Sequence, residues 1–214
     1  MTVRADTRLR RLPEQGSKDF DLACSIIDDA RICHVGFTLE GQPYVVPMAL
    51  ARDGKRLLIH GSVASRLMKS LAAGLPCCVT VTHFDGLVLA RSAFHSSMNY
   101  RCVMVFGTAT AVTDADEKIH GLDTLTAHLL PGRLAELRPS TRKELNATTL
   151  LSLPMERFSV KTRSGPPDDP AAESRVPIWA GVVPLKMTAG KPVPAPDMPA
   201  GIDLPDYLRR PDWP

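Results

Sequence analysis

The most informative polar residues of the chain lie within residues 60–71, which read HGSVASRLMKSL. The apolar run before them predicts a strand that ends at His60, and a short helix follows Gly61. Helical spacing brings four polar residues together near the start of this helix: Ser62, Ser65, Arg66 and Lys69. Hydroxyl groups, a guanidinium and an ammonium beside the unpaired N–H groups of a helix start form a site for a phosphate monoester.

The same segment also fits the solvent-exposed face of an ordinary amphipathic helix. Its apolar side is formed by Ala64, Leu67, Met68 and Leu71. Spacing alone favours this simpler interpretation, so the phosphate site needs further support. The GxxxxGK[ST] spacing of a nucleoside-triphosphate loop is absent, which argues against a nucleoside triphosphatase.

A second polar segment, residues 85–101, reads DGLVLARSAFHSSMNYR between two apolar runs. Its hydroxyls, amide and imidazole are suited to line a ligand pocket, and the alternative is an ordinary exposed loop. No metal site is predicted, because no HxxxH or HExxH spacing occurs. A serine nucleophile is not predicted either, because no GxSxG motif is present. Cys77 and Cys78 are neighbours in an apolar run and point to opposite faces of a strand, which argues against a redox pair.

Composition excludes several classes of protein. The net charge of the 214 residues is only +3 and aromatic residues make up 5%, which argues against a nucleic-acid partner. No run approaches the roughly 20 apolar residues needed to span a bilayer, and the basic N-terminus lacks the apolar region of a secretory signal. We therefore expect a soluble cytoplasmic protein with no membrane partner.

The segments around these motifs predict a mainly β fold of the α+β kind. Strands are predicted at residues 32–38, 43–51, 56–60, 77–84, 87–93, 100–112, 155–163 and 176–183. Asp53-Gly54 and Asp85-Gly86 are strong hairpin signals between apolar runs, and Gly107 predicts a bulge or bend. Helices are predicted to start at Ser17 and after Thr113 or Asp114. Short antiparallel strands with inserted helices indicate a closed or partly closed barrel.

Three separated motifs resemble one known family: HGSVASRLMKSL, DGLVLARSAFHSSMNYRCVMVFGTA and VPIWAGVVPL. They are similar to the pyridoxamine 5′-phosphate oxidase-like flavin-binding split barrels, and within these to the nitroimidazole-resistance-type branch. The likeness implies a six-stranded antiparallel split β-barrel with flanking helices. It also implies a homodimer with flavin mononucleotide (FMN) at the subunit interface.

The resemblance assigns roles to individual residues. It implies that the phosphate of FMN is bound by Ser65, Arg66 and Lys69. The ring system and ribityl chain would lie along His60, Gly61 and Ser62, with His60 also matching a catalytic histidine beside the flavin. The remaining contacts of the cleft would come from Thr80, Thr82, Asn99 and Tyr100, and from Trp179 of one of the two subunits. The strand at residues 43–51 departs from the family, because Met48-Ala49-Leu50 stand where relatives often have a tyrosine.

The function implied is that of an FMN-dependent oxidoreductase, which passes electrons from a reduced nicotinamide to a small organic substrate. Two alternatives stay open. One is a flavin-binding carrier or sensor without turnover, and the other is a split barrel that binds haem or a deazaflavin. Haem would need an axial histidine, for which His60 or His95 are the candidates. The residues that grip pyridoxal phosphate in the true oxidases are not recognisable.

The ends of the chain differ in composition from its middle. Residues 1–12 are predicted to form a flexible basic arm, and residues 13–185 are predicted to form the split-barrel domain. Residues 186–214 hold seven of the 19 prolines, which predicts an extended tail. The tail is expected either to be disordered or to lie across a partner subunit through Tyr207, Leu208 and Trp213.

Overall fold

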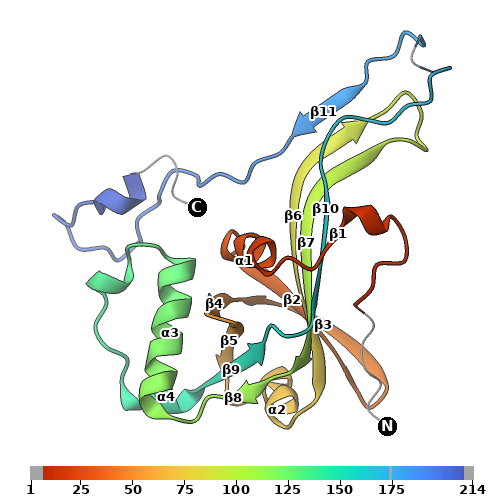
Figure 1. Ribbon diagram of the computed structural model, residues 1–214. Helices are drawn as coiled ribbons and strands as arrows, with labels where there is room; N and C mark the ends of the chain where they lie inside the picture. Colours follow the sequence, from red (N-terminus) through yellow and green to blue (C-terminus); the bar gives the residue numbers. More distant parts are fainter. Residues whose placement is uncertain (1–6, 174, 210–214) are drawn as a thin grey trace.

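The computed structural model describes residues 7–173 and 175–209, which leaves Trp213 outside the described residues. Within these residues the chain forms four α-helices and eleven strands (Figure 1). The helices are α1 (Phe20–Asp28), α2 (Arg66–Ala72), α3 (Ala115–Leu129) and α4 (Arg142–Ala147), with short 3₁₀ helices η1 (Pro13–Gln15), η2 (Leu134–Glu136) and η3 (Asp206–Arg209). The strands are β1 (Gly16–Ser17), β2 (Ile32–Leu39), β3 (Gln42–Ala49), β4 (Ala51–Asp53), β5 (Arg56–Ser62), β6 (Pro76–Leu89), β7 (Ser97–Thr108), β8 (Thr110–Ala111), β9 (Thr148–Pro154), β10 (Phe158–Arg163) and β11 (Gly181–Pro184).

The strands form two antiparallel sheets. The larger sheet has the order β1-β10-β7-β6-β2-β3, with β11 paired to the outer part of β6. The smaller sheet has the order β4-β5-β9-β8. This confirms the predicted mainly β split barrel. The strand count exceeds the predicted six, because short strands such as β1, β4 and β8 add to the main ones.

One apolar core fills the space between the two sheets. Val79 and Val81 of β6 face it from the larger sheet, and Leu57 and Ile59 of β5 face it from the smaller one. Helices α1 and α2 close it with buried Ile26, Ile27, Leu67, Met68 and Leu71. A second cluster lies on the other side of the smaller sheet, beneath α3, and consists of Ala51, Leu58, Val112, Leu125 and Leu150.

Side-chain caps set the start of the two longer helices. Helix α1 begins at Phe20, three residues later than predicted, because the Asp19 carboxylate accepts hydrogen bonds from the N–H groups of Asp21 and Leu22. Helix α3 follows Asp114 as predicted, and Asp114 accepts from the N–H of Glu117 at 2.9 Å. No capping box forms there, since the Glu117 carboxylate pairs with Arg56 instead.

The predicted hairpin at Asp85-Gly86 is wrong, because β6 runs straight through these residues. Gly86 pairs with Asn99 of β7 and with Pro184 of β11, with a register shift after Phe84. The Asp85 carboxylate accepts two hydrogen bonds from Arg101, each of 3.0 Å. A side chain at Gly86 would approach the Val183 carbonyl oxygen to 3.0 Å, so the glycine permits close strand pairing here rather than a turn.

Two further differences concern the smaller sheet. Strand β9 was not predicted, although its Leu150, Leu151 and Leu153 are buried. The predicted strand 100–112 is divided, since β7 ends at Thr108 in the larger sheet and β8 starts at Thr110 in the smaller one. The chain thus changes sheets close to the predicted bend at Gly107.

Beyond the barrel, the ends of β6 and β7 run together into a projecting arm, on which β11 pairs (Figure 1). The tail returns to the body near the end of α3, where the Tyr207 hydroxyl donates to Glu136 at 3.0 Å. Among the described residues, no helix is long and apolar enough to cross a membrane.

Candidate functional site

The start of α2 is built by Ser65 and by the apolar side of the helix. Ser65 is the N-cap, and its hydroxyl oxygen accepts a hydrogen bond from the N–H of Met68 at 3.5 Å. Leu67, Met68 and Leu71 are buried in the core as their spacing predicts. The polar residues of the helix therefore face outward. The Ser65 O–H is still able to donate to a ligand, since only its oxygen serves as the cap.

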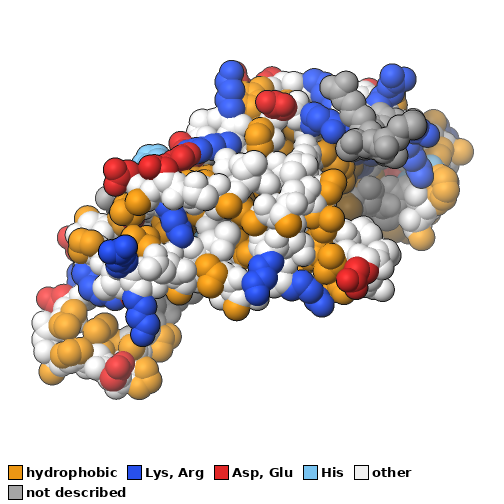
Figure 2. All heavy atoms as spheres, turned by 90° about the horizontal axis from the view of Figure 1, so that it is seen from below, with side chains coloured by type: hydrophobic (Ala, Val, Ile, Leu, Met, Phe, Trp, Pro, Cys, Tyr) orange, Lys and Arg blue, Asp and Glu red, His pale blue; other side chains and the backbone are white. Residues whose placement is uncertain are grey.

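Arg66 and Lys69 supply positive charge that no acidic side chain neutralises. Both are exposed, and within the described residues neither side chain forms a hydrogen bond or an ion pair. The Arg66 guanidinium lies 4.4 Å from the centre of the Tyr44 ring, which holds it by a cation–π contact. By contrast, Arg52 and Arg101 are each paired with aspartates. Seen from below, the molecule has Lys and Arg side chains spread over its face among uncharged ones, with acidic side chains in separate places (Figure 2).

Gly61 and Ser62 connect β5 to α2. A side chain at Gly61 would come within 2.9 Å of Met68 Cγ, so the glycine permits α2 to pack closely on the strand. Ser62 is exposed, and its hydroxyl oxygen accepts from the N–H of Ala64 at 3.2 Å, which shapes the turn into the helix.

His60 lies on a different side of the barrel from these residues. It pairs with Leu150 and shares the face of β5 that carries Leu58, beneath α3 and α4, whereas Gly61 faces α2. Its Nδ1 is buried and has no hydrogen-bond partner among the described residues. Burial lowers the pKa of His60, which favours a neutral imidazole.

This lowered pKa predicts a stability change with pH. The unfolded chain takes up a proton at His60 near its ordinary pKa of about 6.5, whereas the folded chain resists protonation. The wild type should therefore lose stability relative to His60→Gln as the pH falls from about 7.5 to 5.5. Melting temperatures of both proteins across this range check it. Parallel curves would show that burial does not perturb His60.

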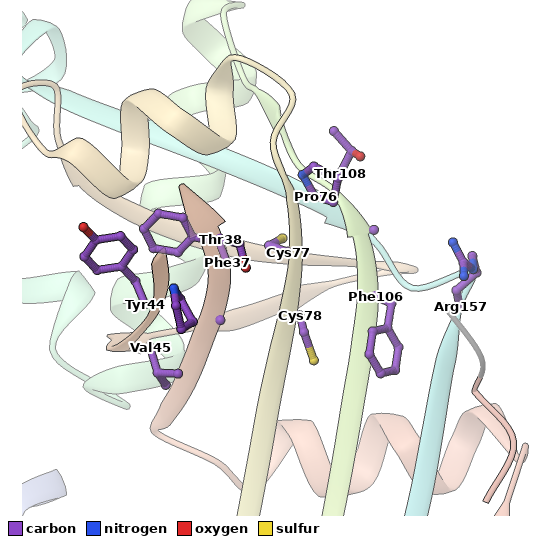
Figure 3. A pocket seen from close by; sticks show the side chains of 13 residues that line it. Phe37, Thr38, Tyr44, Val45, Pro76, Cys77, Cys78, Phe106, Thr108 and Arg157 are labelled. Atoms are coloured by element: carbon purple, nitrogen blue, oxygen red, sulfur yellow. The ribbon is translucent and has the colours of Figure 1, made fainter. Parts of the chain in front are cut away.

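A cavity of about 550 Å³ lies at the end of the larger sheet, next to α2 (Figure 3). Its walls are largely aromatic and apolar, and include Phe37, Tyr44, Val45, Pro76, Cys78 and Phe106. Phe37 and Tyr44 stack with their ring centres 5.3 Å apart. Since Arg66 lies over the same Tyr44, this cavity and the unpaired cations of α2 share one wall.

The cavity lies at the edge between the two faces of the larger sheet, because Phe37 and Tyr44 pack against the core whereas Val45, Cys78 and Phe106 point to the outer face. Three predicted site residues lie on this outer face. Cys78, Thr80 and Thr82 alternate with core residues along β6, so they point away from the barrel. Tyr100 of β7 lies on the same outer face. It pairs with Phe84, which follows Thr82 by two residues and so points to the same side of β6. The same face carries exposed apolar side chains: Ile32 (54%), Val45 (68%) and Phe84 (48%).

Asn99 and Trp179 lie on the arm. Asn99 is buried, and its amide donates to the Gly165 carbonyl at 3.1 Å and accepts from Arg163 at 2.6 Å. Trp179 is 66% exposed just before β11. In a single chain, therefore, the outer face of the larger sheet carries Thr80, Thr82 and Tyr100. His60 lies in the smaller sheet and Trp179 lies on the arm, so neither is next to them.

Sequence reasoning missed the aromatic wall of the cavity. Phe37 and Tyr44 stand in adjacent strands and pair directly across the hairpin of β2 and β3. This pairing could have been predicted from the turn at Glu40-Gly41, because counting outward from the turn along both strands brings Phe37 opposite Tyr44. The contact of Tyr44 with Arg66 has no such signal, because it depends on how α2 packs.

Comparisons with known proteins agree with this fold. The sequence profile of the family described as pyridoxamine 5′-phosphate oxidase matches residues 20–162. The structure of a FAD- and haem-binding protein from Mycobacterium smegmatis is 42% identical, with a TM-score of 0.87, over 91% of this chain and 96% of that one. A flavocytochrome from Azotobacter vinelandii is 35% identical, with a TM-score of 0.89, over 95% and 94% of the two chains.

A structure assigned as a 5-nitroimidazole antibiotic resistance protein from Bacteroides thetaiotaomicron is more distant. It is 26% identical, with a TM-score of 0.58, over 68% of this chain and 85% of that one. No curated protein sequence matches the chain.

Proposed function

This chain belongs to the pyridoxamine 5′-phosphate oxidase family, and from that premise we propose that it is a flavin-binding oxidoreductase. One observation carries the proposal. Two exposed cations without acidic partners, Arg66 and Lys69, lie at a serine-capped helix start beside an aromatic cavity. A phosphate attached to a flat ring system has the chemistry that such a site binds.

Ser65, Arg66 and Lys69 would hold the phosphate. The guanidinium and the ammonium donate charge-assisted hydrogen bonds, and the serine hydroxyl adds a neutral one. Tyr44 limits the motion of Arg66, so less side-chain entropy is lost when the anion binds.

The flavin ring would use the cavity and the outer sheet face. The outward-facing Val45, Cys78 and Phe106 offer an apolar surface to a planar ring, and the cavity volume lies within the usual range for small ligands. The hydroxyls of Thr80 and Thr82 offer donors to its polar edge. When bound, a flavin supplies two-electron transfer between a reduced nicotinamide and a small organic acceptor.

FMN is the flavin predicted from the sequence, whereas the M. smegmatis relative binds FAD. FMN ends in a phosphate monoester, whereas in FAD the same phosphate is part of a pyrophosphate. Cationic and hydroxyl donors can hold either group, so the proposal covers both. Titration of flavin-free protein with FMN and FAD in parallel, followed by fluorescence, identifies the preferred one.

The flavin site would be completed in a homodimer. A sheet face that exposes Ile32, Val45 and Phe84 is typical of a surface that another chain covers. The arm projects beyond the barrel and carries Trp179, 66% exposed, which is free to reach a second subunit. This arrangement brings residues from two chains to one flavin, although they lie apart in a single chain.

Reduction kinetics test the oxidoreductase activity against a carrier or sensor without turnover. The protein loaded with flavin is mixed with NADH or NADPH in a stopped-flow instrument, and an electron-poor acceptor is then added. An enzyme shows rapid bleaching of the flavin absorption and recovery that depends on the acceptor. Bleaching no faster than that of free flavin would support the carrier or sensor.

Haem is a second candidate ligand, because the M. smegmatis relative binds haem as well as FAD. His60 fits an axial role, since its pKa is lowered by burial and a neutral imidazole is the form that binds iron. The absorption spectrum of the protein purified from haem-supplemented cells tests this. A Soret band that is lost in His60→Ala would support it, and a spectrum with flavin bands alone would reject it.

A further inference from the structure

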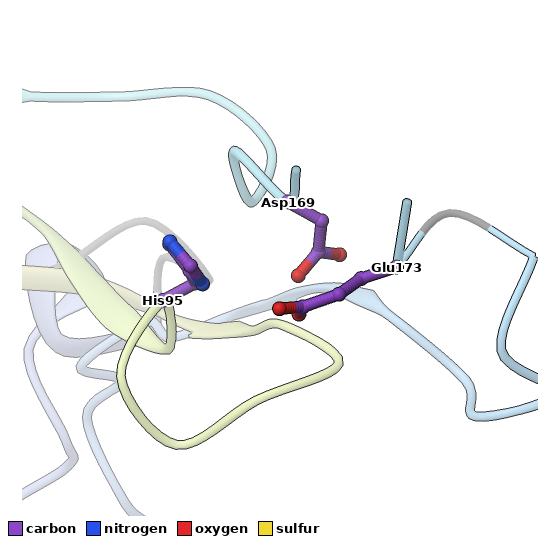
Figure 4. A group of neighbouring side chains, drawn as sticks. All are labelled: His95, Asp169 and Glu173. Carbon is purple, nitrogen blue, oxygen red and sulfur yellow. The ribbon is translucent and has the colours of Figure 1, made fainter. Parts of the chain in front are cut away.

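The arm brings together three metal-ligating side chains outside the proposed flavin site. His95 lies in the loop between β6 and β7, and Asp169 and Glu173 lie in the segment between β10 and β11 (Figure 4). Their ligand atoms all lie within 4.8 Å of one another, and all three residues are half-buried. The two carboxylates point toward each other, and the imidazole faces them from the other loop.

Glu173 has a polar atom that nothing described in the structure satisfies. Its Oε2 is buried and has no hydrogen-bond partner among the described residues. A buried carboxylate oxygen without a partner is destabilising, whereas a bound cation would satisfy it. This atom is the independent sign that a ligand belongs in the cluster.

The other two side chains are held in place by neighbours. The Asp169 side chain is only 5% exposed and accepts from the Arg91 backbone N–H at 2.9 Å and from its guanidinium at 2.7 Å. Each Asp169 oxygen keeps a second lone pair for a metal. The Ser92 hydroxyl lies 2.9 Å from His95 Nδ1, so with Nδ1–H as donor the lone pair of Nε2 is free.

We infer that His95, Asp169 and Glu173 bind one divalent transition-metal ion, with Zn²⁺ as the matching species. One imidazole and two carboxylates form a mixed N/O set that zinc accepts, and a water molecule completes four ligands. The two carboxylates supply two negative charges to the dication, and the Arg91 guanidinium holds Asp169 in place. The ion joins the two loops of the arm and thereby fixes the segment that carries β11 and Trp179. The sequence predicted no metal site, because the ligands come from segments far apart in the chain.

Zinc binding by the full-length chain, freed of any affinity tag and dialysed against EDTA, tests this inference. Titration with Zn²⁺ against a competing fluorescent chelator should give one site per chain in the wild type. His95→Ala should weaken it by roughly a hundredfold or more, since even loss of an outer-shell partner costs 10- to 100-fold. His120→Ala is the matched control, because His120 is an exposed histidine on α3 and should leave the affinity unchanged.

Thermal melting provides a second readout. Zn²⁺ should raise the melting temperature of the wild type and of His120→Ala but not that of His95→Ala. Glu173→Gln keeps the shape of the side chain and should also show no rise in melting temperature with Zn²⁺. This variant tests the inference if His95→Ala fails to fold. No binding of Zn²⁺ by the wild type, or equal binding by wild type and Glu173→Gln, would overturn the inference.

Discussion

Replacing Arg66 and Lys69 together by alanine should lower the affinity for flavin by about two to four orders of magnitude. Each charge-assisted hydrogen bond is worth about 1.5–3 kcal/mol, and tenfold in affinity corresponds to about 1.4 kcal/mol. Both side chains are exposed and free of ion pairs, so their removal should leave the fold intact. Fluorescence titration of the double variant with FMN and FAD measures the loss.

The control is Arg142→Ala with Lys143→Ala on α4. It removes the same charge from two exposed cations near a helix start, neither of which lines the cavity. Its flavin affinity should stay within about twofold of the wild type, because screened charges at a distance contribute little. Equal losses in both double variants would mean that only the overall charge matters. An unchanged affinity in Arg66→Ala with Lys69→Ala would remove the phosphate site from the proposal.

The second large effect is expected at the exposed face of the larger sheet. If the proposed flavin-loaded dimer forms through this face, Ile32→Asp should convert it into a monomer and weaken flavin binding. Ile32 is 54% exposed and lies on the face of Thr80 and Thr82. In a twofold symmetric interface each subunit carries the substitution, so two aspartates are buried. At about 2 kcal/mol for each buried polar group, the dissociation constant of the dimer should rise about a thousandfold.

Light scattering combined with gel filtration, at equal protein concentration, measures the oligomeric state of each variant. Ile119→Asp is the matched control, since Ile119 is also an exposed isoleucine, at 39%, but lies on α3. That variant should remain a flavin-loaded dimer. A monomeric wild type that binds flavin, or a dimer that persists in Ile32→Asp, would exclude this face as the interface.

The parts of the site that depend on local spacing could be predicted from the sequence. Ser65 caps α2, and Leu67, Met68 and Leu71 face the core, because helix periodicity and capping are local properties. Thr80 and Thr82 share a face for the same kind of reason, since residues alternate along a strand.

The parts that depend on partners distant in sequence could not be predicted. Asp85-Gly86 has the local signature of a turn, yet pairing with β11 and two hydrogen bonds from Arg101 keep it in a strand. His60 precedes Gly61 by one residue, but the smaller sheet turns its ring toward α3 rather than toward α2. The meeting of His95 with Asp169 and Glu173 depends likewise on the pairing of the arm.

The crystal structure of the chain purified with its bound flavin tests the central claim most directly. We predict phosphate oxygens within hydrogen-bond distance of the Ser65 hydroxyl, the Arg66 guanidinium and the Lys69 ammonium, with the ring against the outer sheet face. A flavin whose phosphate lies elsewhere, or a colourless protein that takes up neither FMN nor FAD, would contradict it.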